Sequence, residues 1–145
     1  MDQATKQAFH QAVEKEPFAK ALHMELVEID DGYSVVEMVF DPGSMSNIYK
    51  MAHGGVIFAL IDEAFETASN SHGTVALALN VNITYIATPE PGARLRAEAR
   101  EVSRTRKTAT YDIKVNEADG KLLATCQALC YRKKDKIPFL QSSPS

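Results

Sequence analysis

The sequence predicts an α+β domain in which a curved antiparallel sheet wraps around one long central helix. The segment 53–70 lacks proline, has no glycine after Gly55 and is dense in alanine, leucine, isoleucine and phenylalanine. A helix this apolar cannot lie on the surface of a soluble domain. Strand and turn patterns flank it on both sides, so a sheet wrapped around the helix would bury it. The length of 145 residues suits one domain with one core.

The elements before the central helix are a helical segment and a hairpin. Apolar spacing over residues 3–22 predicts an amphipathic helix, with a short second helical turn after Pro17. Residues 24–29 and 33–40 have strand patterns, and the Asp-Asp-Gly turn between them predicts a hairpin. Residues 41–51 are rich in Pro, Gly, Ser and Asn and predict a loop.

The chain after Gly73 predicts antiparallel sheet. Residues 75–86 are rich in β-formers, and the Pro-Glu-Pro-Gly turn that follows precedes an alternating strand pattern at 94–100. Two further strand patterns, 108–116 and 121–132, are joined through Asp-Gly, a strong hairpin signal.

The predicted organisation is a helical segment at 1–22, the sheet-and-helix domain at 23–132 and a flexible tail at 133–145. The tail prediction rests on a charged stretch followed by proline and serine.

Composition excludes several classes of protein. A net charge of −3 argues against nucleic acid as the main partner. No apolar stretch reaches the ~18 residues of a membrane span, and the amino terminus lacks a signal-peptide pattern. Cys126 and Cys130 share one face of a predicted strand but lie too far apart to bridge, which fits reduced, buried thiols. The sequence therefore predicts a soluble, cytoplasmic protein without a membrane or nucleic-acid partner.

One face of the central helix carries a stripe of small and acidic residues. The stripe consists of Gly55, Ala59, Asp62, Glu66 and Ser69, with Phe58 and Phe65 beside it. Asp62 and Glu66 could simply face water. The functional interpretation is a partly desolvated carboxylate suited to nucleophilic or general-base chemistry. The small residues would also allow close approach of a second helix.

The start of the central helix offers the other half of a reactive site. Gly54 and Gly55 leave first-turn N–H groups unshielded at the positive end of the helix dipole. A substrate carbonyl placed there would be polarised as in an oxyanion hole. The alternative role of the glycines is steric room for a neighbour.

The spacing between these two halves predicts a dimer. Gly54 and Asp62 lie about 12 Å apart along a helix, so one carbonyl cannot touch both on the same chain. If both act on it, they come from different copies, with two central helices antiparallel across a two-fold axis.

At these residues the chain resembles the PaaI-type hotdog-fold acyl-CoA thioesterases of the 4-hydroxybenzoyl-CoA thioesterase-like superfamily. The resemblance is carried by the run AHGGVIFALIDEAF at 52–65, by ASNSHG at 68–73 and by NITY at 82–85. It covers roughly residues 20–132 in the same order and spacing. It implies a hotdog fold, hydrolysis of an acyl- or aryl-CoA to free acid and CoA, a homodimer that pairs into a homotetramer, and no cofactor beyond the CoA of the substrate.

The resemblance also assigns roles by position. Asp62 serves as nucleophile or as base for water, and the Gly54 N–H contacts the thioester carbonyl. Asn47 helps to place the substrate or the attacking water. His53 belongs to the motif, with either a site role or a structural role at the helix start. Gly55, Phe58 and Glu66 belong to the substrate side of the site.

Some relatives carry a serine near the attacking water where this chain has Ala78. By the period of two, Asn80 and Asn82 share the face of Ala78, so either could replace that hydroxyl. The basic segment Arg104, Arg106 and Lys107 is the candidate contact for CoA phosphates, and a solvated basic turn is the alternative.

Three competing hypotheses remain. A hotdog dehydratase typically has a proline-rich loop before the helix, but no proline follows Pro42 until Pro89 here. A non-catalytic acyl-CoA sensor would not need Asp62. A metal site from His53, Asp62, Glu66 and His72 lacks the spacing that gathers ligands on one face, so no metal is predicted. Phe58, Phe65, Tyr85 and Met51 could line an acyl pocket or belong to the core, so the acyl group stays open.

Overall fold

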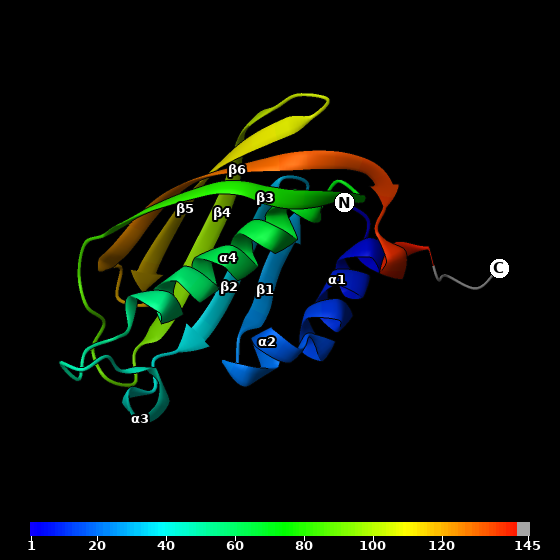
Figure 1. Ribbon diagram of the computed structural model, residues 1–145. Helices are drawn as coiled ribbons and strands as arrows, with labels where there is room; N and C mark the ends of the chain where they lie inside the picture. Colours follow the sequence, from blue (N-terminus) through cyan, green and yellow to red (C-terminus); the bar gives the residue numbers. More distant parts are fainter. Residues whose placement is uncertain (142–145) are drawn as a thin grey trace.

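The computed structural model describes residues 1–141, and its first elements are two short helices. α1 spans Gln3–Lys15 and α2 spans Pro17–Ala21, so the predicted segment 1–22 divides at Pro17. Asp2 caps α1 by accepting a hydrogen bond from Thr5 N at 2.8 Å. Proline fixes its own φ and lacks an N–H, which suits the first turn of a new helix. α1 lies beside the rest of the domain with Phe9 and Val13 buried (Figure 1).

The central helix α4 spans Gly54–Asn70, as the sequence predicts. His53 is its N-cap, and Ser71 follows its last turn. Gly73 then takes a φ of +81°, a conformation that glycine adopts without the strain of a Cβ atom. Asn70 links the end of the helix to the next strand, since its Oδ1 accepts from Ala76 N at 2.9 Å.

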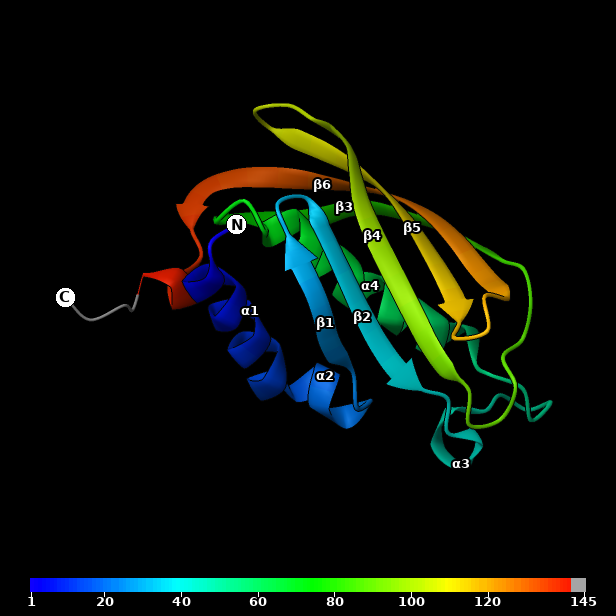
Figure 2. The same cartoon turned by 180° about the vertical axis from the view of Figure 1, so that it is seen from behind.

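The sheet has six antiparallel strands in the order β1-β2-β4-β5-β6-β3. The strands are β1 Glu25–Asp30, β2 Tyr33–Val39, β3 Thr74–Tyr85, β4 Arg94–Arg104, β5 Thr108–Glu117 and β6 Leu122–Lys136. The sheet curves around α4 (Figures 1 and 2), which confirms the predicted hotdog architecture. β3 pairs with β6 and leaves its other side at the edge of the sheet.

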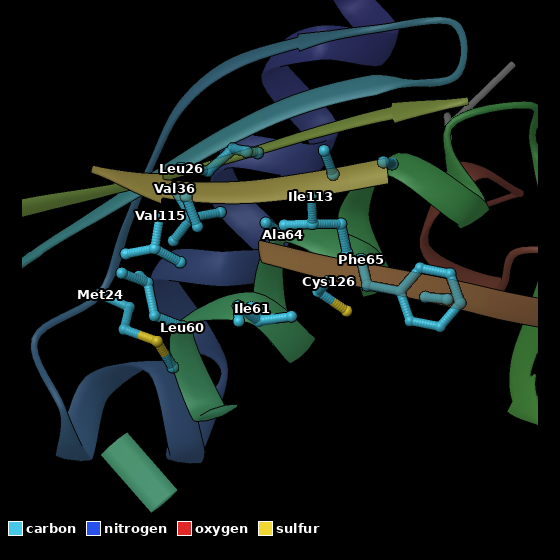
Figure 3. Close-up of a cluster of buried hydrophobic side chains, with 14 of the residues drawn as sticks. Met24, Leu26, Val36, Leu60, Ile61, Ala64, Phe65, Ile113, Val115 and Cys126 are labelled. Atoms are coloured by element: carbon cyan, nitrogen blue, oxygen red, sulfur yellow. The ribbon is translucent and has the colours of Figure 1, made fainter. Parts of the chain in front are cut away.

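The core lies between the concave face of the sheet and α4. Leu60, Ile61 and Phe65 of the helix meet side chains from β1, β2, β5 and β6 there (Figure 3). Phe65 also packs edge-on against Tyr111, with ring centroids 5.5 Å apart. Cys126 and Cys130 are free and buried, as expected. These core contacts fix the rotation of α4 about its axis, and with it the direction in which Asp62 points.

The structure corrects two sequence predictions. The predicted loop at 41–51 contains a single helical turn, α3 Pro42–Met45, capped when Asp41 Oδ1 accepts from Gly43 N at 2.9 Å. The predicted tail from 133 is ordered through 141. β6 runs to Lys136 because its pairing with β3 continues to Thr74, and Ile137 is buried before the short helix η1 Pro138–Leu140. Residues 142–145 of that predicted tail lie outside the described part of the chain.

Within residues 1–141, no helix combines the length and the apolar character that crossing a membrane requires.

Candidate active site

Asp62 lies in the middle of α4, on the predicted stripe of small and acidic residues. Its side chain is half-buried, and no other group in residues 1–141 donates a hydrogen bond to it or pairs with its charge. Burial therefore acts alone and raises the pKa of Asp62 above its ordinary value of 3.8. A desolvated carboxylate without a partner is a stronger base than a solvated one, which suits proton abstraction or nucleophilic attack.

Asp62 opens into a hollow of about 330 Å³ between α4 and the start of β3. Glu66 and Ala78, both predicted site residues, line the same hollow, as does Phe65 of the core. Although Glu66 keeps an exposed edge, partial burial and the nearby charges of Glu16 and Asp62 raise its pKa to about 7. The structure thus brings Asp62, Glu66 and Ala78 together.

The first turn of α4 presents one free N–H group. Gly55 N donates to Nδ1 of His53 at 3.0 Å, and the next two N–H groups of the helix donate to the His53 carbonyl oxygen. Gly54 N–H has no acceptor among residues 1–141. The expectation that both glycines leave their N–H groups free is therefore wrong for Gly55, because the His53 cap occupies it. Gly54 alone can donate to a substrate oxygen.

Tyr85, at the end of β3, holds the Gly54 peptide in place. Its hydroxyl donates to Gly54 O at 3.0 Å, and a Cβ atom at Gly54 would lie 3.3 Å from Cζ of the ring. A side chain at position 54 would therefore crowd the ring, which would have to shift by a few tenths of an ångström. The sequence names Tyr85 only as a candidate pocket residue, since no sequence pattern connects it with a residue 31 positions earlier.

Asn47 lies beside this helix start. Its Oδ1 accepts from Tyr49 N at 2.9 Å and from Met51 N at 3.1 Å, which shapes the turn 47–51 before the helix. Asn47, Gly54 and Tyr85 line a second hollow of about 280 Å³. The structure therefore joins the predicted pair Asn47 and Gly54, and the side-chain amide of Asn47 keeps its donor group available.

His53, Gly55 and Phe58 lie on the outer surface of α4 or at its start. His53 is exposed and acts through its Nδ1 as the helix cap, which is the structural alternative that the sequence left open. Gly55 is exposed, and Phe58 keeps 39% of its surface exposed although it is a large apolar residue. These residues line neither hollow within one chain.

The two hollows share no lining residue, so they are separate places on one chain. One contains the carboxylate of Asp62, and the other contains Asn47 and the Gly54 N–H. Within one chain the carboxylate and the N–H donor therefore do not share a hollow.

A β-bulge in β3 overturns one prediction about the face of the sheet. Ala78 pairs with Cys130, but Asn80 pairs with Leu129, so Leu79 is an extra residue in the strand. The extra residue reverses the alternation. Ala78 faces the Asp62 hollow, whereas Asn80 and Asn82 line hollows together with Asp112 and Gln127, away from Asp62. Neither asparagine can stand in for a hydroxyl at Ala78 within the same chain.

The basic segment lies at the hairpin between β4 and β5, which projects beyond the body of the sheet (Figure 1). Arg104 is occupied, since its Nη1 lies 2.7 Å from Nδ1 of His72 and its Nε lies 3.5 Å from Glu101. The side chains of Arg106 and Lys107 are exposed and have no ion pair among residues 1–141. Arg106 and Lys107 therefore remain available to a phosphate, whereas two donor nitrogens of Arg104 already have partners.

Comparison with known proteins places this architecture in a family. Residues 49–124 match the model of the Thioesterase superfamily. A putative esterase of Archaeoglobus fulgidus is 43% identical over 117 residues, which cover 81% of this chain and 75% of the relative.

The acyl-coenzyme A thioesterase PaaI of Escherichia coli is 32% identical over 85% of this chain and 87% of its own. A solved structure of the E. coli PaaI protein superposes with a TM-score of 0.85, covering 90% of this chain and 94% of that one at 31% identity. A Streptococcus mutans protein solved with acetyl CoA superposes with a TM-score of 0.73 at 26% identity, over 79% of this chain and 91% of that one.

These similarities confirm the predicted PaaI-type hotdog resemblance and the predicted enzyme class, a thioester hydrolase. The chain belongs to the thioesterase superfamily.

Proposed function

We propose that this protein hydrolyses acyl-CoA thioesters at sites that two copies of the chain complete together. The observation that carries the proposal is the division of the site. Asp62 is a desolvated carboxylate without a partner, and Gly54 is a free N–H donor, yet they lie in separate hollows of one chain.

The chemistry requires both halves. As a general base, Asp62 takes a proton from a water molecule, and the water oxygen attacks the thioester carbonyl carbon. As a nucleophile, the Asp62 carboxylate attacks that carbon itself and forms an anhydride, which water then cleaves. The carbonyl oxygen gains negative charge, which the Gly54 N–H of the partner copy stabilises at the positive end of the helix. The C–S bond then breaks, the electron pair leaves with sulfur, and the thiolate of CoA takes up a proton. Asn47 positions the substrate or water beside Gly54.

The edge of the sheet supports pairing of two copies. β3 is a 12-residue edge strand, and Leu77, Leu79 and Tyr85 on it keep roughly half of their surfaces exposed. Long edge strands with exposed apolar side chains are usually covered, because they otherwise aggregate. A second copy packed along β3 would cover them and set the two α4 helices antiparallel. We further propose that such dimers pair into tetramers.

CoA as the thiol component is supported by the E. coli relative, named an acyl-coenzyme A thioesterase, and by the S. mutans neighbour solved with acetyl CoA. In this proposal CoA is part of the substrate, no separate cofactor takes part, and the enzyme acts in the cytoplasm.

Hydrolysis of an acyl-CoA panel, followed by the release of free thiol, tests the reaction. We expect Asp62→Asn to reduce kcat by about 10³-fold, within the usual range for a general base. Asp112→Asn, an exposed carboxylate on β5, is the matched control and should keep full activity. Absence of thiol release from every acyl-CoA by the unaltered chain would instead favour a non-catalytic acyl-CoA sensor.

Mixing two inactive variants tests the division of the site between copies. Gly54→Pro removes the N–H donor but retains Asp62, and Asp62→Asn retains the donor. After unfolding and refolding together, half of the dimers are mixed and each has one intact site, so about a quarter of the activity should return. No recovery would place both groups in the same chain's site and contradict the proposal.

A further inference from the structure

Three glutamates from distant parts of the chain meet between α1 and α4. Glu16 lies at the junction of α1 and α2, and Glu63 and Glu66 lie one turn apart on α4. One carboxylate oxygen of each residue can be chosen so that all three atoms lie within 4.8 Å of one another. We refer to Glu16, Glu63 and Glu66 as the glutamate cluster.

The cluster has no positive partner in residues 1–141. None of the ion pairs there involves Glu16, Glu63 or Glu66. Lys15 lines the groove beside the cluster, but it forms no ion pair with it. Asp62 adds further negative charge from the neighbouring turn of α4. Carboxylates this close repel each other strongly unless a cation or shared protons lie between them.

Glu63 makes the strongest case for a bound ligand. Glu63 is only 2% exposed, and its Oε1 has no hydrogen-bond partner among the described residues. A buried carboxylate oxygen without a partner is costly and calls for an explanation, such as an ion at the site. Here the carboxylate belongs to a cluster whose three members together could coordinate one ion.

A groove of about 450 Å³ connects the cluster with solvent. It runs between α1, α4, the start of β3 and η1, and Glu16 and Glu66 lie in its wall. An ion can therefore enter through the groove and reach Glu63 from the side of Glu16 and Glu66. An oxygen-only set of carboxylates suits hard cations such as Ca²⁺, Mg²⁺ and Mn²⁺.

We propose that Glu16, Glu63 and Glu66 form a binding site for one hard divalent cation, which fastens α1 to the central helix. The proposal does not rest on the thioesterase reaction, although Glu66 also lines the Asp62 hollow. Its ligand set differs from the one that the sequence weighed, because it includes Glu16 and Glu63. Sequence spacing could not show it, because Glu16 lies far from the other two glutamates along the chain and reaches them only through the packing of α1.

Protons compete with the cation for the carboxylates of the glutamate cluster. Without a cation, burial first and then the charge of Glu16 raise the pKa of Glu63 to about 8. Binding experiments therefore belong at pH 8.5 and above, where protons compete less.

Thermal unfolding of the full chain in EDTA, and in CaCl₂, MgCl₂ or MnCl₂, tests the proposal. We expect Tm to rise by about 8 °C when one of these cations is present at 100 times its dissociation constant. Electron paramagnetic resonance of added Mn²⁺ should show one bound ion per chain. Glu63→Gln and the less buried Glu16→Gln should each abolish the rise and weaken Mn²⁺ binding at least tenfold. Glu14→Gln, an exposed glutamate on the same helix, should leave both unchanged.

Two outcomes would overturn the proposal. The first is that no cation changes Tm and that Mn²⁺ does not bind. A higher Tm of Glu63→Gln than of the unaltered chain in EDTA would then show that shared protons stabilise the cluster. The second is unchanged Mn²⁺ binding in Glu16→Gln, which would place the ion elsewhere. Neither outcome bears on the hydrolysis of acyl-CoA, which is measured separately.

Discussion

The polar groups at the start of α4 are held by hydrogen bonds, whereas the carboxylate in its middle is not. At the start, His53 caps Gly55, Tyr85 holds the Gly54 carbonyl, and one N–H remains free. In the middle, no group among residues 1–141 donates a hydrogen bond to Asp62, and burial alone raises its pKa. The first region is a donor held in a fixed position, and the second is a negative charge kept poorly solvated.

In the proposed reaction, this difference lets one helix supply both the oxyanion donor and the base. A developing oxyanion needs donors that are already oriented. A base needs a carboxylate that gains by accepting a proton. These requirements are incompatible at one position, and the helix separates them by two turns.

Removing the donor from the helix start should have a large effect, comparable to that of Asp62→Asn. Gly54→Pro lacks the N–H, yet proline suits the first position of a helix and the extended His53 before it. We expect kcat to fall by 10²- to 10³-fold, as for loss of one oxyanion donor. Gly54→Ala carries the same Cβ atom near Tyr85 and keeps the N–H, so it controls for crowding. Equal losses in steady-state kinetics of the two variants would show that crowding, and not the donor, is responsible.

The pH dependence of kcat/KM probes the carboxylate in the middle of the helix. Asp62 must be ionised to act, and its pKa is raised above 3.8, so activity should fall as pH falls through that raised pKa. The acid limb should therefore lie above pH 4 and approach a tenfold loss per pH unit. Asp112→Asn should retain this limb. A profile that stays flat down to pH 4 would argue against Asp62 as the titrating base.

Loosening the helix start, without removing its donor, should have a moderate effect. Tyr85→Phe deletes the hydroxyl that donates to Gly54 O. Loss of one such hydrogen bond is worth about 1 kcal/mol, which corresponds to about a fivefold fall in kcat. The aromatic ring remains, so Tm should change little. A large fall in Tm with unchanged kcat would mean that Tyr85 serves the fold and not the donor.

A substitution in the basic hairpin, which is distant from both regions, should have the smallest effect on the kinetics. Arg106→Ala removes an exposed charge with no partner in residues 1–141, and we expect KM for acyl-CoA to rise about threefold at low salt and less at high salt. Arg104→Ala is the comparison, since Arg104 already contacts His72 and Glu101. A KM that responds to neither change at any ionic strength would assign the hairpin a solvated surface role.

Much of the fold follows from local sequence patterns. The boundaries of α4 were predictable because an apolar segment lies between a histidine-glycine start and a glycine stop. The strands were predictable from alternation and turns. The bulge at Leu79 was not, because one extra residue leaves the apolar character of β3 unchanged while it turns Asn80 and Asn82 to the other face.

The extent of β6 was missed for a related reason. Its charged end at 133–136 resembles a tail in composition, yet it pairs with the start of β3 and leads to the buried Ile137. Cross-strand partners, which composition does not reveal, decide such cases.

The sequence by itself determined the hotdog class, and it singled out Asp62, Gly54 and Asn47 as candidate site residues, because helix and strand periodicity and residue chemistry are local properties. Only the tertiary structure decided which N–H is free, that Tyr85 contacts Gly54, which face Asn80 takes and that Glu16 joins Glu63 and Glu66. Each of these depends on segments that are far apart in the chain, and packing alone brings them together.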